Sequence, residues 1–310
     1  MNQLSTLIRR ELWEHKATFL VLPAVVTGVF TAVLLILLVG LYTDAVSVDM
    51  DLDVETHNEQ REFILRDSSL MDLFGTQLKK LEAQPDHVIE EQLNNVYTGT
   101  SVIWFAILWV VVFFYLLSAL YDERKDRSIL FWKSMPVSDW LTVASKLGAG
   151  LIVAPAIYLF FIVVAHLILI TLASFAAIGQ DIDIWKTLWS SANLVTRWLG
   201  FVGLYGFTLL WCLPFFAWLL MVSSWAKSAP LAWAVGIPIV LVLLEGMLID
   251  TQVLGTFIRQ HTFSFEFWQH GRDLMNQFEL AEALELMVTL VVGMAFLGGA
   301  VWFRGKADEM

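Results

Sequence analysis

Six long apolar segments constrain this chain more than any other feature of its sequence. A helix that crosses a bilayer needs roughly 20 mostly apolar residues, because lipid offers no partner for an unpaired backbone N–H or C=O group. Six windows meet this requirement: residues 18–41, 99–121, 147–173, 198–222, 229–249 and 283–303. The sequence therefore predicts an all-α integral membrane protein with six transmembrane helices.

The composition of the chain favours the same class. Hydrophobic residues make up 58% of the chain and charged residues only 16%, whereas soluble domains average about 45–50% apolar and about 25% charged residues. The net charge of -11 argues against a nucleic-acid partner, which requires clustered Lys and Arg. The single cysteine, Cys212, excludes a disulfide within the chain.

The distribution of Lys and Arg predicts the orientation in the membrane. If the N-terminus lies inside, the cytoplasmic pieces are 1–17, 122–146, 223–228 and 304–310, and they hold 11 of the 19 basic residues. The outer pieces are about twice as long and hold the other 8. The positive-inside rule therefore places both termini in the cytoplasm, and we expect a multi-pass protein of the bacterial inner (plasma) membrane.

Two outer loops stand out. Residues 42–98 carry 13 Asp and Glu residues, and the helical spacing of Phe63, Leu70, Phe74 and Leu81 predicts a small helical periplasmic loop domain. Residues 250–282 are rich in Phe and Trp, which are common at headgroup depth. This second loop is expected to form an interfacial or partly re-entrant helical pair.

The longest predicted cytoplasmic loop, residues 122–146, combines charges with aromatic residues. Phe131 and Trp132 follow a run of charged residues, and after Pro136 a helix is expected to start at Ser138 or Asp139. Exposed aromatic residues beside arginines are typical of protein interfaces. The loop is interpreted either as a hairpin lying in the lipid headgroups or as a docking element for a soluble partner, and we prefer the second interpretation.

The N-terminal segment, residues 3–16, has the pattern of an amphipathic helix. Its leucines form one stripe, and Arg9 and Arg10 lie elsewhere on the helix. Glu11 and His15 intrude on the apolar face, which burial in lipid does not explain. Two explanations remain open: these side chains contact the loop 122–146, or they reach back to water.

The loop 122–146 also resembles part of a known protein family. Its sequence resembles the first cytoplasmic loop of ABC-2-type permeases, in which a Glu-Arg pair and a short "LP-S" stretch precede a Lys at the start of the third span. The matching residues are Glu123, Arg124, Met135, Pro136, Ser138 and Lys146, and the later Ser-rich turn of the family matches Ser223, Ser224, Lys227 and Ser228. The resemblance covers about 25 residues by motif and most of the chain by layout.

This resemblance implies a partner and an energy source. Residues 122–146 would contain the coupling helix that contacts a dimeric ABC ATPase, through Glu123, Arg124, Arg127, Phe131, Trp132, Pro136 and Ser138. Residues 1–17 would form the elbow helix, with Arg9, Arg10, Glu11 and His15. The chain has no G-x-x-x-x-G-K-[ST] loop, so ATP and Mg²⁺ would bind to the ATPase, and this chain would not be an enzyme by itself. A second permease, identical or homologous, would complete the complex within the membrane lipid.

A few polar residues inside apolar windows are further candidates. Glu245 and Glu285 are interpreted either as carboxylates hydrated near the interface or as groups on the translocation path or its outer gate. His166 is expected to be a packing residue rather than a proton relay. The histidines show no metal-ligand spacing, and no metal or other cofactor is expected in this chain.

Three functions follow from these observations. The first is a permease subunit that transports, in the family's usual export direction, an unidentified substrate. The second keeps the ATPase partner but transmits force to the periplasmic loop, as a mechanotransmission or sensing subunit. The third, a membrane-embedded enzyme acting on lipids, would need a polar cluster within the spans, where the chain offers only Glu245, Glu285 and His166.

Overall fold

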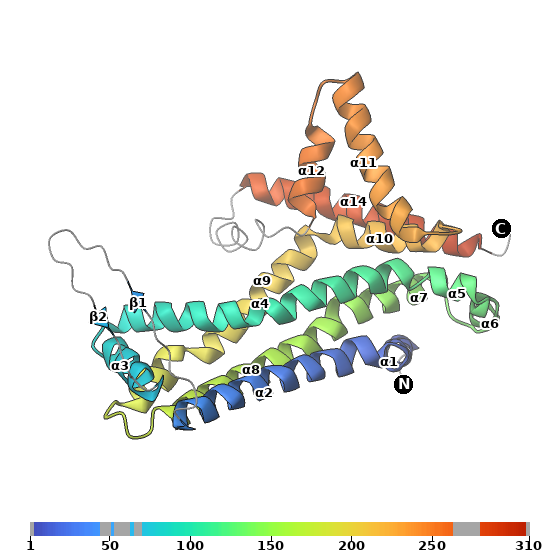
Figure 1. Cartoon of the computed structure of the whole chain (residues 1–310). Helices are drawn as coiled ribbons and strands as arrows, with labels where there is room; N and C mark the ends of the chain where they lie inside the picture. Colours follow the sequence, from blue (N-terminus) through green and yellow to red (C-terminus); the bar gives the residue numbers. More distant parts are fainter. Residues whose placement is uncertain (1–2, 44–50, 53–62, 65–69, 263–279, 308–310) are drawn as a thin grey trace. The chain divides into compact units, whose positions relative to one another are not determined.

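The computed structural model describes residues 3–43, 51–52, 63–64, 70–262 and 280–307. Figure 1 follows the chain from α1 to α14. Most of the described residues are helical. The two strands, β1 (Asp51–Leu52) and β2 (Phe63–Ile64), have two residues each and pair antiparallel. The other parts of the predicted outer loops, residues 44–50, 53–62, 65–69 and 263–279, lie outside the described residues.

The described helices are α1 (Gln3–Glu14), η1 (Ala17–Val21), α2 (Leu22–Thr43), α3 (Leu70–Glu82), α4 (Asp86–Ser118), α5 (Tyr121–Lys125), α6 (Ser128–Ser134), α7 (Asp139–Gly148), η2 (Ala149–Val153), α8 (Ala154–Ala176), η3 (Trp185–Ser190), α9 (Leu194–Trp211), α10 (Leu213–Trp225), α11 (Pro230–Leu248), α12 (Val253–His261) and α14 (Leu280–Gly305). The elements labelled η are short π-helical stretches that continue neighbouring helices. The predicted all-helical class is thereby confirmed for the described residues.

Six of the helical stretches are long and apolar enough to cross a membrane: Ala17–Thr43, Asp86–Lys125, Asp139–Ala176, Trp185–Trp211, Pro230–Leu248 and Ala283–Gly305. Their number equals the number of apolar windows in the sequence. The structure therefore supports a multi-pass membrane protein.

The fourth window differs from its prediction. The sequence predicted one helix over residues 198–222, but α9 ends at Trp211 and α10 begins at Leu213. Pro214 lies in the first turn of α10, where its missing N–H costs nothing, whereas inside a continuous helix its ring would clash with the preceding turn. The long apolar stretch is therefore Trp185–Trp211, followed by the shorter helix α10.

The predicted loop 42–98 also differs in detail. Leu70 begins helix α3, which contains Phe74 and Leu81 as predicted, but Phe63 belongs to β2. Helix α4 already begins at Asp86, directly after Pro85, so the second window starts well before residue 99. A proline before the first helical residues is compatible with helix initiation because the first N–H groups have no partner inside the helix.

The described residues form two compact units. One consists of Val21–Phe105 and Leu159–Thr196. Its core includes Trp104, whose indole N–H donates to Thr27 Oγ1 at 3.2 Å. His166 is fully buried there, with Nε2 at 3.0 Å from Ser101 Oγ and 3.1 Å from the Tyr97 carbonyl. These contacts agree with the expected packing role of His166.

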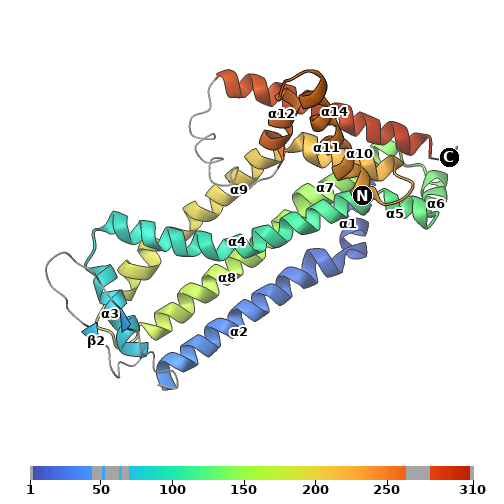
Figure 2. The same cartoon turned by 45° about the horizontal axis from the view of Figure 1, so that its top comes forward.

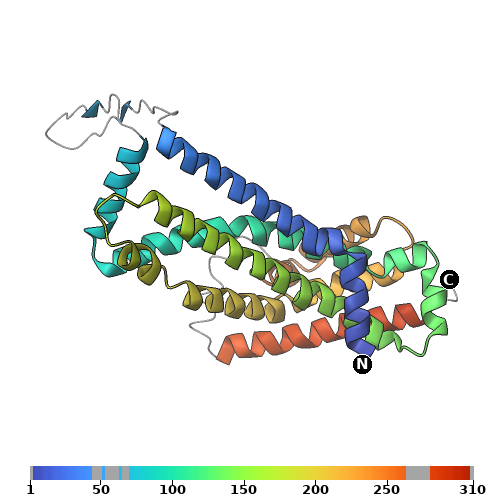
Figure 3. The same ribbon diagram turned by 90° about the horizontal axis from the view of Figure 1, so that it is seen from below.

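The other unit consists of Met1–Leu20, Ala106–Tyr158 and Arg197–Met310. Helices α10 and α14 run side by side in it, as Figure 2 shows. A Cβ atom at Gly293 would lie 2.7 Å from Leu213 Cγ, and one at Gly299 would lie 2.7 Å from Met221 Sδ. Small residues thus permit the close approach of the two helices, as is usual in membranes. Helix α1 packs on α7, which also contacts α14 (Figure 3).

Candidate functional site

The loop 122–146 folds into two short helices and the start of a long one. Arg127, in the left-handed region with φ 62°, separates α5 from α6. Asp126 accepts a hydrogen bond of 2.9 Å from the Ser128 N–H, and this bond lowers the pKa of Asp126. The Ser138 side chain caps α7 by accepting from the Leu141 N–H at 3.2 Å, which confirms the predicted helix start.

Six charged side chains meet at the inner side of this loop. We call them the buried charge cluster, in which four side chains are buried and Arg10 and Asp139 are partly exposed: Arg10, Glu11, Glu123, Asp139, Lys146 and Arg304. They come from α1, α5, α7 and α14. The cluster therefore joins the N-terminal helix, the loop and the last helix of the chain.

Glu123 accepts contacts from three cations of the cluster. Its Oε1 lies 3.0 Å from Lys146 Nζ and 3.1 Å from Arg10 Nη2, and its Oε2 lies 2.6 Å from Arg304 Nη1. Arg304 Nε also lies 3.1 Å from Asp139 Oδ1. The short charge-assisted hydrogen bond from Arg304 to Glu123 helps to fix the position of the helix end that carries Arg304.

Glu11 is the second centre of the cluster. Its carboxylate has no exposed surface and contacts Lys146 Nζ at 3.1 Å, Arg10, and the Tyr115 hydroxyl, which donates to Oε2 at 3.0 Å. Burial by itself would raise the pKa of Glu11, but Lys146 and Arg10 outweigh it and hold the pKa below its ordinary value. Glu11 is therefore ionised inside the protein.

The cluster is electrically balanced, with three carboxylates and three cations. Buried ion pairs contribute little net stability compared with apolar residues, but removal of one partner leaves a buried charge without compensation. Such a cluster therefore specifies one arrangement of the helices that contribute to it.

Aromatic side chains cover the cluster. The Arg10 guanidinium carbon lies 3.9 Å from the centre of the Trp132 ring, a cation–π contact between α1 and α6. His15 packs edge-on against Tyr115 at 4.8 Å between ring centres. Of the two explanations for Glu11 and His15, contact with the loop therefore holds for Glu11, through Lys146, and His15 packs against Tyr115.

A second set of contacts fastens α5 to the end of α10. Arg124 Nη2 donates to the carbonyls of Ser223 at 2.8 Å and Ala226 at 2.7 Å. In return, Ser223 Oγ accepts from the N–H groups of Leu120 and Tyr121, both at 2.9 Å. The Glu-Arg pair and the Ser-rich turn, which the sequence singled out separately, thus meet in space.

The outer side of the loop exposes apolar side chains. Leu130 and Phe131 on α6 are 59% and 61% exposed, and Met135 and Trp140 are also exposed. Arg127 and Pro136 lie on the same exposed segment. An apolar, arginine-flanked surface on a firmly held segment has the properties of a protein-binding surface.

The other sequence-predicted residues have separate surroundings. Arg9 is exposed and takes no part in the cluster. Glu245 accepts hydrogen bonds from the N–H groups of Leu254 and Gly255 and from the Thr251 hydroxyl, at 2.9 to 3.2 Å. Glu285 instead lies 3.7 Å from His261 Nε2. Each carboxylate thus has its own partners, and the described contacts include none between the two.

Sequence reasoning missed part of the site. Arg304, Asp139 and Tyr115 belong to it, and Lys146 was noted only through the family resemblance. A signal was present for Arg304, because a cation directly after an apolar window is buried only when a carboxylate is nearby. Within the described part of the chain, no group of three or more His, Cys, Asp or Glu residues is placed to hold a metal ion.

Comparison of the chain with models of protein families, with curated proteins and with solved structures finds no significant match.

Proposed function

We propose that this chain is the membrane permease subunit of an ABC transporter and that the exposed face of α6 docks a separate ATPase. The observation that carries the proposal is the buried charge cluster, which fastens the loop bearing Leu130 and Phe131 to α1, α7 and α14. A soluble motor can do work on membrane helices only through a stiff connection, and a loop held by buried charges supplies one.

The continuation of α7 supports the same role. Helices α7, η2 and α8 form one uninterrupted stretch of 38 residues, Asp139–Ala176. A displacement of its first turn, next to the proposed ATPase contact, is therefore passed along a helix long enough to cross the membrane. In this mechanism ATP and Mg²⁺ bind to the ATPase, and ATP binding selects one membrane state only if the two states differ in affinity for it.

The proposal includes a topology and further partners. Both termini and the loop 122–146 face the cytoplasm at the bacterial inner membrane, and a second permease, identical or homologous, completes the pathway. The transported substrate is unidentified, and export is the proposed direction.

A specific observation favours a second function, force transmission without transport. Helix α4 has 33 residues, and at 1.5 Å per residue it is about 50 Å long, whereas a hydrocarbon core is about 30 Å thick. The excess is polar at the Asp86 end, next to α3. Such an extension could carry movement to a partner outside the membrane.

The test of ATPase docking uses the exposed pair rather than residues of the cluster. The full chain is purified from its native membranes, and vanadate-sensitive hydrolysis of Mg²⁺-ATP in the preparation is measured. We expect Leu130→Ser with Phe131→Ser to abolish the co-purified hydrolysis, because loss of central apolar contacts typically costs about 2 kcal/mol or more each. Phe175→Ser, a change at another exposed Phe, is the matched control.

The outcomes are distinct. Wild-type chain that brings no such hydrolysis, or a double variant that retains all of it, overturns the proposal. If hydrolysis is present, reconstitution into vesicles separates transport from force transmission, since only a transporter shows ATP-dependent accumulation of a substrate from a test panel.

A further inference from the structure

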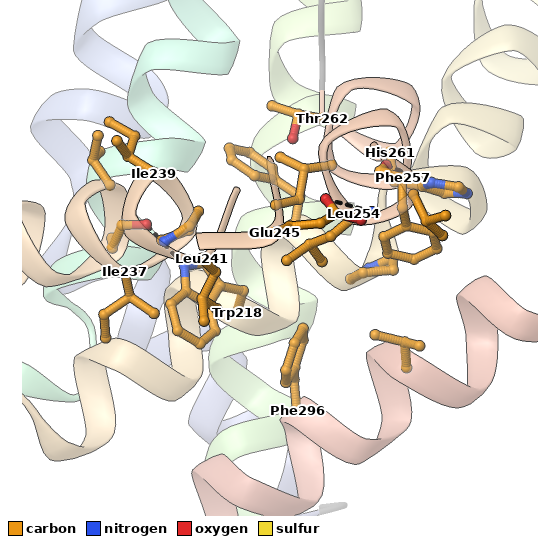
Figure 4. A pocket seen from close by; sticks show the side chains of 18 of the residues that line it. Trp218, Ile237, Ile239, Leu241, Glu245, Leu254, Phe257, His261, Thr262 and Phe296 are labelled. Carbon is orange, nitrogen blue, oxygen red and sulfur yellow. Dashed lines mark hydrogen bonds between the residues drawn. The ribbon is translucent and has the colours of Figure 1, made fainter. Parts of the chain in front are cut away.

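A cavity of about 650 Å³ lies between α10, α11, α12 and α14, all within one unit. Figure 4 shows it from close by. Apolar side chains form nearly all of its wall, among them Trp218, Pro238, Leu254, Phe257 and Phe296. This volume lies within the range of small-molecule sites in proteins, about 300–1,000 Å³.

Two sets of hydrogen bonds hold the helices around the cavity. Pro238 inside α11 has no N–H, so the Ala234 carbonyl lacks its usual helical partner. The Trp218 indole N–H on α10 donates to that carbonyl at 3.0 Å. At the other end, Glu245 binds the first N–H groups of α12 and holds this helix against α11.

Apart from the Thr262 hydroxyl, the polar groups at the cavity already have hydrogen-bond partners. The Ala234 carbonyl is bound by Trp218, Glu245 by three residues around the start of α12, and His261 Nδ1 lies 2.9 Å from the Phe257 carbonyl. A polar or charged ligand would find no free partner among these groups. The chemistry of the wall matches an uncharged hydrocarbon chain.

The residues at the mouth of the cavity indicate the source of such a hydrocarbon chain. Ile239, Leu241 and Val288 line the cavity and are each about half exposed. These residues belong to helices long and apolar enough to cross a membrane. An apolar mouth on such helices opens toward lipid, and a void among apolar side chains loses dispersion contacts that a hydrocarbon chain restores.

We propose that this cavity binds one acyl chain of a bilayer phospholipid. The inference is independent of the proposed function, since it holds whether or not an ATPase docks on α6. An acyl chain that enters the cavity leaves one apolar medium for another, so the hydrophobic effect does not favour the transfer. The acyl chain is selected by its shape complementarity to the wall, as in helix packing within membranes. Trp218, Phe257 and Phe296 supply contacts on several sides, which the flat outer surface of a helix cannot.

The test uses the full chain in nanodiscs of dioleoyl phosphatidylcholine with a trace of the same lipid carrying a diazirine on one acyl chain. After illumination, labelled residues are mapped by mass spectrometry. Val288→Trp fills the mouth, and Val291→Trp makes the same change on the same helix outside the cavity. We expect labelling at Phe257 to fall at least about fivefold in the first variant, an effect of roughly 1 kcal/mol, and to be unchanged in the second.

Equal labelling of Phe257 in both variants overturns the proposal, as does wild-type labelling no stronger at Phe257 than at the exposed Met247. If Val288→Trp fails to fold, the pair Leu241→Trp (at the mouth) and Leu243→Trp (outside the cavity) replaces it.

Discussion

Glu11 and Lys146 lie 135 residues apart in the chain, yet the Lys146 ammonium donates a hydrogen bond of 3.1 Å to the Glu11 carboxylate. Both side chains are almost completely buried. This contact joins the N-terminal helix α1 to the long helix that starts at Asp139, and so makes α1 and the loop 122–146 one structural unit.

The first prediction concerns this pair. Lys146→Met removes the cation shared by Glu11 and Glu123 and leaves two buried carboxylates with fewer partners. We expect the free energy of unfolding to fall by about 3–5 kcal/mol, measured by denaturant unfolding of the full chain in detergent micelles. Lys125→Met, at an exposed lysine of α5, should change it little.

A double variant separates charge from packing. Glu11→Gln combined with Lys146→Met removes one acid and one base, so part of the loss should be recovered, with a coupling energy of about 0.5–3 kcal/mol. Strictly additive losses would mean that the two side chains do not stabilise one another.

The second prediction compares two neighbouring serines. Ser223 Oγ accepts from the backbone N–H groups of Leu120 and Tyr121, whereas Ser224 Oγ donates to the Met221 carbonyl in its own helix. Ser223→Ala leaves two donors unpaired, which costs about 1–3 kcal/mol for a buried group. Hydrogen exchange at Leu120 and Tyr121 should therefore accelerate in Ser223→Ala and not in Ser224→Ala. Similar exchange in both variants would show that α5 is held without this hydroxyl.

The apolar windows could be predicted from the sequence because a bilayer-spanning helix needs a long apolar run. Such a run is contiguous in the sequence and can be recognised without knowledge of distant contacts. The last window, residues 283–303, agrees closely with the helical stretch Ala283–Gly305. The fourth window, residues 198–222, does not agree with a single helix. The mean hydropathy of a window is insensitive to Pro214, whereas a proline inside a helix kinks or breaks it. Proline in an apolar run therefore permits two interpretations, a kinked helix or two helices, and tertiary packing decides between them.

Only part of the candidate site could be predicted from the sequence. Glu11 was conspicuous as a carboxylate on an apolar face, but its partners lie 104 and 135 residues away at Tyr115 and Lys146. Spacing along a helix reports neighbours three or four residues away and is silent on such distant ones. Glu245 illustrates the same limit, since its role depends on how α12 folds back on α11.

The third prediction tests Glu245 as the cap of α12. Glu245→Gln keeps one acceptor oxygen but turns an amide N–H₂ toward the N–H groups of Leu254 and Gly255. We expect the local stability of α12 to fall because these N–H groups lose an acceptor, observed as faster hydrogen exchange across Val253–His261. Glu285→Gln, which removes the other carboxylate near α12, should leave Leu254 and Gly255 unchanged. Unaltered exchange in Glu245→Gln would exclude the capping role.

The fourth prediction concerns pH and His261 at the other end of α12. The ring is 2% exposed and stacks on Phe257 and Trp211. Burial lowers the pKa of His261, against the opposing effects of the Phe257 carbonyl and of Glu285. The folded protein therefore binds the proton less readily than the unfolded chain, and stability present above the ordinary histidine pKa of about 6.5 is lost as pH falls below it.

Thermal unfolding of the full chain in detergent, followed from about pH 8 to about pH 5, measures this loss. His261→Gln cannot take up the proton, so its unfolding temperature should depend less on pH than that of the wild type. His87→Gln, at an exposed histidine of α4, is the matched control and should retain the wild-type slope. If His261→Gln and the wild type lose stability in parallel, the pH dependence arises from other groups.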